Sequence, residues 1–194
     1  MAILRYTASA DTTITNAYEA NMVTRGSGSN MGYADALEVF SIYGQESGSN
    51  GQSQELSRIL IEFPVSVISA NRTAGTIPAS GSVEFYLKMY NARTPFTLPQ
   101  NFNLIVAPVS QSWNEGTGLD MDEYQDLGQA NWGKPTLAAD WTSQGGDYLT
   151  ASNYNVSFPK GYENLEVNVS EIMERWITAS NEINNYGCGI HLTA

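Results

Sequence analysis

The chain has 194 residues, of which only 15% are charged, and a formal net charge of −11 at pH 7. Its nine Lys and Arg residues are scattered singly, which argues against the basic clusters that bind nucleic-acid phosphates or anionic membrane surfaces. The only cysteine, Cys188, excludes an intrachain disulfide, and the only histidine, His191, excludes a histidine-rich metal site.

Short runs of alternating apolar and polar residues, separated by turn residues, predict β-strands along most of the chain. The clearest run is residues 83–90, where the odd-numbered positions are apolar while Glu84 and Lys88 lie on the opposite face. In the last run, residues 188–192, His191 lies opposite the apolar positions, as an ordinary strand histidine does. In chain order, strands are predicted at residues 12–15, 37–43, 58–63, 83–90, 104–109, 156–158, 165–167 and 188–192.

One helix is predicted near the C-terminus, over residues 169–177, because the apolar positions 169, 172, 173, 176 and 177 form a single helical stripe. With Asn168 as N-cap, Glu171 falls at the third helical position, as in a capping box. Val167 and Ile172 then occupy the positions of a hydrophobic staple.

Two segments without strand periodicity are predicted to be loops. Residues 44–53, with the sequence GQESGSNGQS, resemble a flexible linker, and residues 110–161 form a long segment rich in turn residues. Since strands do not alternate with helices, a doubly wound sheet is excluded. The sequence therefore predicts a single domain over residues 1–194, an all-β, antiparallel two-sheet sandwich that is jelly-roll-like, with one short C-terminal helix.

A strongly acidic segment lies at residues 112–126. Asp120 and Asp122, with Glu123 or Asp126, supply closely spaced oxygen ligands of the kind that calcium prefers. The spacing does not match an EF-hand, so the alternative is a solvated acidic loop. We expect no catalytic residues here, because an open, glycine-containing segment offers no apolar pocket to raise the pKa of one carboxyl above another.

Trp113, Trp132 and Trp141 are candidates for ligand or partner binding, because an exposed indole can stack on a sugar ring or on a protein surface. Each also has a turn-forming neighbour, as tryptophans that anchor loops often do. Trp176 lies on the helical stripe and is expected in the core.

The order of several motifs resembles the DNRLRE-type β-sandwich domains of secreted carbohydrate-binding and cell-surface proteins. These motifs are ADTTI at residues 10–14, R-x-L-x-x-F at 58–63, W-x-E at 113–115, Asn-Trp at 131–132, the strand and helix at 165–176, and Asn-Tyr-Gly at 185–187. Residues 112–132, 141–147 and 186–193 are more specifically similar to structural proteins of tailed bacteriophages.

The resemblance implies a non-enzymatic virion structural protein, either a capsid decoration or a component of a neck, tail or fibre. Its partners would be other virion proteins or further copies of the chain. The N-terminal residues lack the apolar region of a signal peptide, so we expect assembly of the virion in the host cytoplasm. One alternative is a carbohydrate-binding module that uses Trp113, Trp132 or Trp141 with the acidic loop, with or without calcium as a cofactor. Another is an acidic-dyad glycosidase or lyase.

Overall fold

The computed structural model describes residues 3–43, 54–95, 97–121, 126–178 and 184–193. In chain order, its elements are β1 (Ala10–Thr15), β2 (Ser41–Ile42), β3 (Glu55–Glu62), α1 (Val65–Thr73), β4 (Tyr86–Met89), β5 (Phe102–Pro108), the short 3-10 helix η1 (Thr150–Ser152), β6 (Tyr154–Phe158), β7 (Leu165–Asn168), α2 (Ser170–Ile177) and β8 (Cys188–Leu192). No helix within these ranges is long and apolar enough to cross a membrane.

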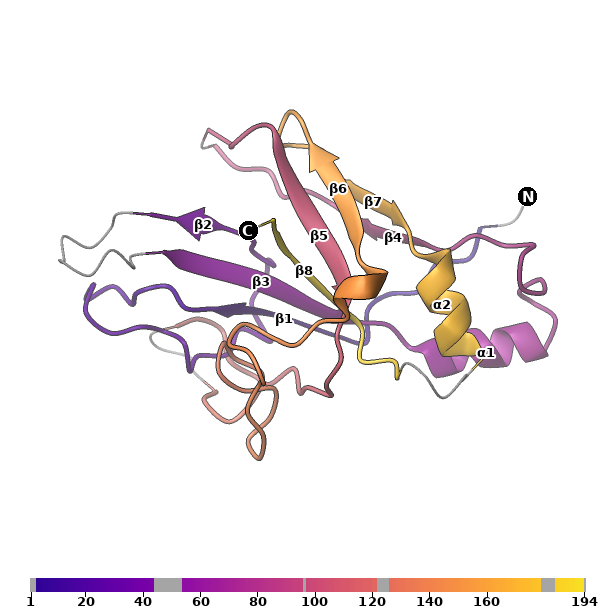
Figure 1. Ribbon diagram of the computed structural model, residues 1–194, viewed down its shortest axis with the longest axis horizontal. Coiled ribbons are helices and arrows are strands. Elements are labelled where there is room, and N and C mark those ends of the chain that lie inside the picture. The colour runs from indigo at the N-terminus through magenta and orange to yellow at the C-terminus, as the bar shows by residue number, and fades with distance from the viewer. Residues whose placement is uncertain (1–2, 44–53, 96, 122–125, 179–183, 194) are drawn as a thin grey trace.

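The strands form one large antiparallel sheet and one small one (Figure 1). The large sheet has the order β1-β3-β8-β5-β6, and β2 pairs with the beginning of β3. The last strand, β8, is inserted between β3 and β5, with Ile190 opposite Ile59 on one side and opposite Val106 on the other. The small sheet consists of β4 and β7. The C-terminal strand therefore joins the two halves of the large sheet.

One face of the large sheet is covered by the two helices and the small sheet. Ile59 and Ile61 of β3 and Ile190 of β8 point to this face, where they pack with Leu87 of β4 and Ile172 of α2. All of these side chains are at most 5% exposed. Because successive strand residues alternate between faces, this core takes every second residue of β3.

The opposite face of the large sheet is covered by a long irregular segment, which we call the loop layer (residues 109–121 and 126–148). Leu60 of β3 and Ile14 of β1 have no exposed surface there, and they pack with Val109 and the tryptophans of the loop layer. Both faces of β3 are therefore buried, which explains its uninterrupted apolar run at residues 59–61.

Each predicted strand overlaps an observed one, and the antiparallel all-β character is confirmed. The predicted strand at residues 37–43 is reduced to β2. The reason is that two of its backbone N–H groups donate to side-chain hydroxyls instead of a strand: Glu38 to Thr13 Oγ1 (3.0 Å) and Phe40 to Ser57 Oγ (2.8 Å).

The prediction of a single helix is wrong, because α1 precedes the small sheet. Only Val65 and Ile68 are buried in this helix, and its β-branched residues make its apolar stripe too weak to recognise. Pro64 at its N-terminal boundary is the local signal that could have revealed it.

The C-terminal helix begins one residue later than predicted, and Asn168 is not its N-cap. The N-cap position is occupied by Val169, while Asn168 ends β7 and its side-chain oxygen accepts from the backbone N–H of Ser170 (3.0 Å). The hydroxyl of Ser170 in turn accepts from the N–H of Phe85 (2.8 Å), which ties α2 to the segment before β4. The predicted apolar stripe is confirmed, and its members Ile172, Met173, Trp176 and Ile177 are buried.

Candidate functional site

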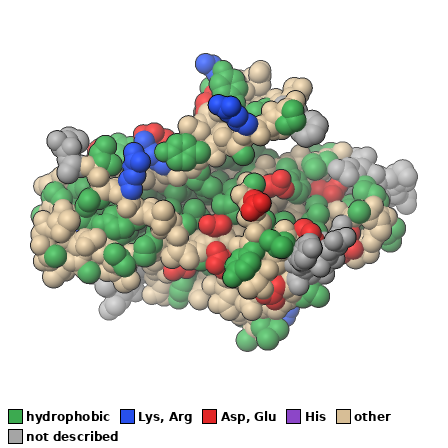
Figure 2. All heavy atoms as spheres, turned by 180° about the vertical axis from the view of Figure 1, so that it is seen from behind, with side chains coloured by type: hydrophobic (Ala, Val, Ile, Leu, Met, Phe, Trp, Pro, Cys, Tyr) green, Lys and Arg blue, Asp and Glu red, His purple; other side chains and the backbone are tan. Residues whose placement is uncertain are grey.

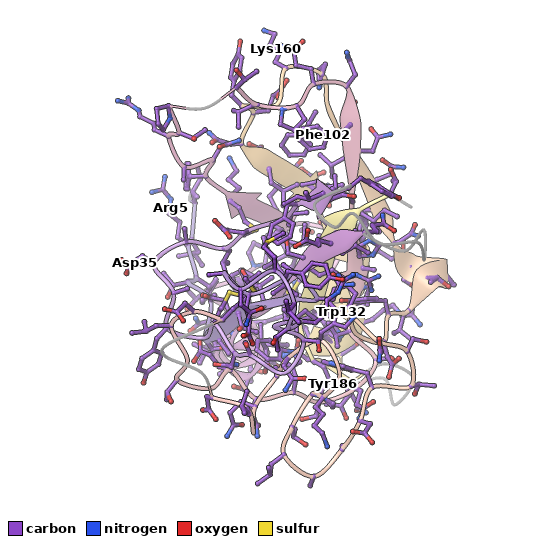
Figure 3. The ribbon with its side chains drawn as sticks, turned by 90° about the vertical axis from the view of Figure 1, so that its left-hand side faces the viewer. Arg5, Asp35, Phe102, Trp132, Lys160 and Tyr186 are labelled. Atoms are coloured by element: carbon purple, nitrogen blue, oxygen red, sulfur yellow. The ribbon has the colours of Figure 1, made fainter. Side chains whose placement is uncertain are left out.

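The three candidate tryptophans lie inside the loop layer. Trp113, Trp132 and Trp141 are 6%, 5% and 5% exposed, and they pack on the large sheet. Figure 3 labels Trp132 in the part of that view where the side chains are most crowded. The indole N–H of Trp113 donates to the carbonyl of Tyr186 (2.9 Å), and that of Trp141 to the carbonyl of Asn131 (2.9 Å). A stacking platform needs an exposed aromatic face, so these residues anchor the loop layer and do not form one.

Two buried asparagines hold the irregular backbone of this region together. Asn30 has no exposed surface, and its amide nitrogen donates to the carbonyls of Glu115 (2.6 Å) and Ala130 (2.9 Å). Its amide oxygen accepts from two further backbone N–H groups, those of Gly32 and Gly118. The amide oxygen of Asn131 likewise accepts from the backbone N–H groups of Gly133 and Lys134. These side chains replace the strand ladder that the loop layer lacks.

The candidate calcium ligands are only partly described. Asp122 and Glu123 lie outside the described residues. Asp126 accepts from the N–H (3.2 Å) and hydroxyl (3.3 Å) of Thr117, so its carboxylate stabilises its own loop. Asp120 is partly exposed. Among the described residues, no group of three or more His, Cys, Asp or Glu side chains could hold a metal ion, and calcium binding stays a prediction.

Glu115 makes a contact with Asp11 that the sequence does not predict. Its carboxylate accepts from the backbone N–H of Asp11 (2.8 Å) and thereby covers the outer edge of β1. Partial burial and the negative charge of Glu115 both raise the pKa of the Asp11 carboxyl. Figure 2 shows that Asp and Glu side chains gather around a hollow on the back of the molecule. Neither Asp11 nor Glu115 lines one of the two pockets described below.

A tight turn at residues 142–147 projects from the loop layer. Gly145 and Gly146 adopt φ angles of +86° and +101°, which side chains other than hydrogen rarely allow. A Cβ atom at Gly145 would lie 2.8 Å from the ring of Trp132. The carbonyl of Gly145 accepts from the guanidinium of Arg58 (2.8 Å) and from the hydroxyl of Tyr148 (2.7 Å). The side chains of Arg58 and Tyr148 therefore hold the turn in place through the carbonyl of Gly145.

The aromatic ring of Tyr148 connects this turn to the lone histidine. The rings of Tyr148 and His191 lie 5.2 Å apart, and Arg58 lies over Tyr148 and Trp132. Burial raises the pKa of Tyr148 to about 12. Burial, with a smaller contribution from the charge of Arg58, lowers the pKa of His191, which keeps its ring neutral at pH 7. The predicted orientation of His191, away from the apolar face of β8, agrees with this packing.

A pocket of about 450 Å³ lies beside the turn and is lined almost entirely by polar residues: Ser110, Thr142, Ser143, Gly146, Asp147, Tyr148 and Thr150. The carboxylate of Asp147 accepts from the N–H groups of Thr142 (2.7 Å) and Ser143 (2.9 Å). Ser110 therefore meets residues 142–150 here, a contact that no spacing rule in the sequence predicts.

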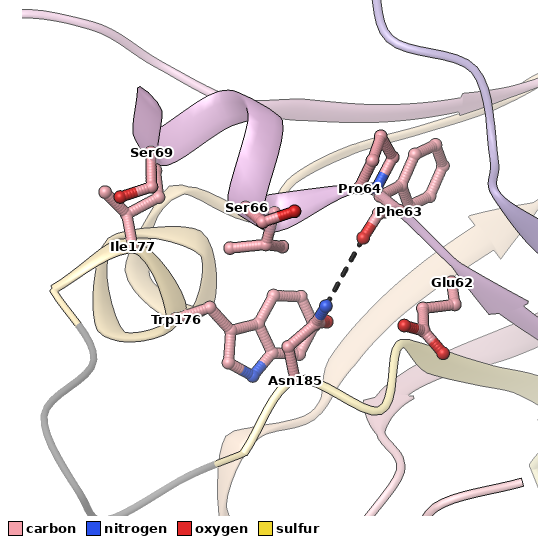
Figure 4. A pocket seen from close by; sticks show the side chains of 9 residues that line it. Glu62, Phe63, Pro64, Ser66, Ser69, Trp176, Ile177 and Asn185 are labelled. Carbon is pink, nitrogen blue, oxygen red and sulfur yellow. Dashed lines mark hydrogen bonds between the residues drawn. The ribbon is translucent and has the colours of Figure 1, made fainter. Parts of the chain in front are cut away.

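A second pocket, of about 390 Å³, lies between the beginning of α1 and the end of α2 (Figure 4). Its wall includes Trp176 and Ile177, and Asn185 closes one side by donating to the carbonyl of Phe63 (3.3 Å). Burial raises the pKa of Glu62, the ionisable residue of this lining. A single carboxyl group does not form the acid–base pair that hydrolysis of a glycoside requires.

Comparison with protein-family models, with curated proteins and with solved structures found no match for this chain.

Proposed function

We propose that this chain is a non-enzymatic structural protein of a tailed-phage virion, in which it decorates the capsid or forms part of a neck, tail or fibre. In this proposal the two sheets form a jelly-roll-like sandwich, and the protein acts by adhesion to other virion proteins or to further copies of itself.

The observation that carries the proposal is the exposure of large apolar side chains on the loop layer. Leu127 is 58% exposed and Leu137 is 73% exposed. Leu137 lies beside Gly128, the residue that follows Leu127, because a Cβ atom on Gly128 would lie 3.3 Å from the end of Leu137. Val23 and Tyr33, from the segment that packs beside the loop layer, are 80% and 60% exposed. Exposed apolar groups of this kind favour contact with another protein.

The state of the most reactive side chains supports a non-enzymatic role. Cys188 is 5% exposed, and burial raises the pKa of its thiol to about 12, which disfavours the nucleophilic thiolate. His191 is half-buried against Tyr148. Neither residue lines one of the two pockets.

The proposal is tested by purifying phage particles from cells that produce the protein with its natural neighbours, followed by cryo-electron microscopy. We expect density for the fold at symmetry-related positions. The double variant Leu127→Asp, Leu137→Asp should be lost from particles while keeping its circular dichroism spectrum. Val67→Asp, on the exposed side of α1, is the matched control and should be incorporated normally.

Two outcomes would contradict the proposal at different levels. Absence of the wild-type protein from every particle would overturn the virion role. Normal incorporation of the Leu127→Asp, Leu137→Asp variant would keep that role but reject the loop layer as the contact surface.

A further inference from the structure

The two outer strands of the large sheet, β1 and β6, differ in how their free edges are covered. The outward backbone N–H of Asp11 in β1 donates to the carboxylate of Glu115 (2.8 Å). The hydroxyl of Thr13 in the same strand accepts from the backbone N–H of Glu38 (3.0 Å). Two other parts of the chain therefore cover β1. In the part of the chain that the structure describes, β6 pairs with β5 alone, because β7, the next strand in the sequence, pairs with β4 (Figure 1).

The pairing of β5 shows which backbone groups of β6 point to the free edge. The carbonyl of Asn103 in β5 accepts from the N–H of Thr193 (3.3 Å), so the odd-numbered residues of β5 direct their backbone groups to β8 and its continuation. Backbone groups alternate in direction along an antiparallel strand, so the even-numbered residues of β5 bond with the even-numbered residues of β6 opposite them. The N–H and C=O groups of Asn155 and Ser157 therefore point outward.

This edge of β6 is open to a further strand. Within the residues that the structure describes, the outward backbone groups of Asn155 and Ser157 have no hydrogen-bond partner, and both side chains are exposed. Edge strands usually carry a charged residue, a proline or a bulge that prevents pairing with another chain. β6 has the sequence YNVSF, without charge or proline, and its register with β5 is continuous.

The sequence of β6 fits a second copy of itself. If two β6 strands pair antiparallel about a two-fold axis at Val156, Asn155 of each copy lies opposite Ser157 of the other. The outward N–H and C=O groups then face each other in both pairs, and each pair makes two reciprocal hydrogen bonds. The two Val156 side chains lie opposite one another, without charge repulsion. We infer that β6 is a dimerisation strand, through which two copies of the chain join their large sheets into one continuous antiparallel sheet.

The inference concerns a different surface from the loop layer, and it does not depend on the virion proposal. Sedimentation velocity of the full chain should show a monomer–dimer equilibrium at concentrations up to about 1 mM. Hydrogen exchange of the backbone amides of Asn155 and Ser157 should slow as the dimer forms, because these amides become bonded. The variant Leu127→Asp, Leu137→Asp is the control and should dimerise like the wild type, since it alters only the loop layer.

The variants Asn155→Lys, Ser157→Lys and Asn155→Glu, Ser157→Glu form a matched pair. In a dimer of either variant two like-charged pairs lie directly opposite each other, so the affinity should fall about tenfold or more. An equimolar mixture places the lysines of one copy opposite the glutamates of the other and should restore the dimer. The inference is overturned if the wild type stays monomeric over this concentration range, if the two amides gain no protection in the dimer, or if the mixture of folded variants does not associate.

Discussion

At the scale of single residues, the loop layer depends on uncharged polar side chains more than on its conspicuous acids. Asn30 bonds four backbone groups from three separate stretches of chain, although those stretches have no strand pairing with one another. Asp126, in contrast, accepts hydrogen bonds from Thr117 and Gly128, which belong to its own loop. An asparagine amide can donate and accept at once, which a carboxylate cannot, and a buried backbone needs both.

The variant Asn30→Ala should therefore lower the free energy of unfolding by about 3 kcal/mol, because it leaves buried backbone donors and acceptors without partners. Urea denaturation measures the change. Asn155→Ala is the control, because Asn155 is exposed on β6 and should change the stability little. Equal effects of both substitutions would show that the Asn30 bonds contribute nothing specific.

Asp11 provides a prediction with a defined pH dependence. Its pKa is raised in the folded state, so protonation favours folding and the ionised carboxylate destabilises the fold at neutral pH. The variant Asp11→Asn should stabilise the protein at pH 7 by less than about 1 kcal/mol, because the group is partly exposed and screened. This gain should shrink as the pH falls through the folded-state pKa and disappear below roughly pH 4. Thermal unfolding across this pH range would detect it, and a gain that grows at low pH would refute it.

At the scale of elements, an ion pair joins the two helices. The guanidinium of Arg72 in α1 makes two hydrogen bonds with the carboxylate of Glu174 in α2, one of them 2.8 Å long. Both side chains are less than a fifth exposed, and the hydrogen bond with Arg72 lowers the pKa of Glu174. The exposed pair of Lys88 and Glu166 links β4 to β7 in the small sheet, with side chains 52% and 55% exposed.

Replacing Glu174 by Gln should destabilise the protein by about 2 kcal/mol at pH 7, because it breaks a charge-assisted, two-bond contact. Glu166→Gln should cost less than about 0.5 kcal/mol, as surface ion pairs usually do. Since the folded-state pKa of Glu174 is lowered, its contribution is present above roughly pH 4 and is lost as the pH falls through that lowered value. Chemical denaturation of both variants at two pH values compares them, and equal losses would contradict the difference in burial.

At the scale of the whole molecule, the two cores share one sheet. Ile59 and Ile61 of β3 belong to the core under the helices, while Leu60 between them belongs to the core under the loop layer. Loss of β3 would therefore expose both cores at once. This arrangement favours one cooperative unit, and the single domain over residues 1–194 stays a prediction.

The variant Trp176→Phe leaves tryptophan fluorescence only in the loop layer, since the other three tryptophans lie there. Its fluorescence should change at the same urea concentration as the far-ultraviolet circular dichroism of the sheets, as for a two-state transition. An earlier fluorescence transition would instead show that the loop layer unfolds as a separate unit.

The spacing of apolar residues along the sequence was sufficient to predict where strands and α2 occur. Alternation at residues 188–192 placed β8 at its observed bounds, and the apolar stripe of α2 was correct although its N-cap was not. The helix α1 was missed because only two of its residues are buried, which leaves almost no stripe. Residue patterns therefore determine an element when packing uses one regular face of it.

The sequence by itself determined the antiparallel all-β character and most strands. Only the tertiary structure decided that Trp113, Trp132 and Trp141 are anchors, that Glu115 meets Asp11 across 104 positions, and that Ser110 meets residues 142–150 in one pocket. The physical reason is that the alternation of apolar and polar residues shows which side chains of a strand are buried. The residues of an irregular segment follow no such period. Its side chains acquire their surroundings only when distant segments pack against the sheet.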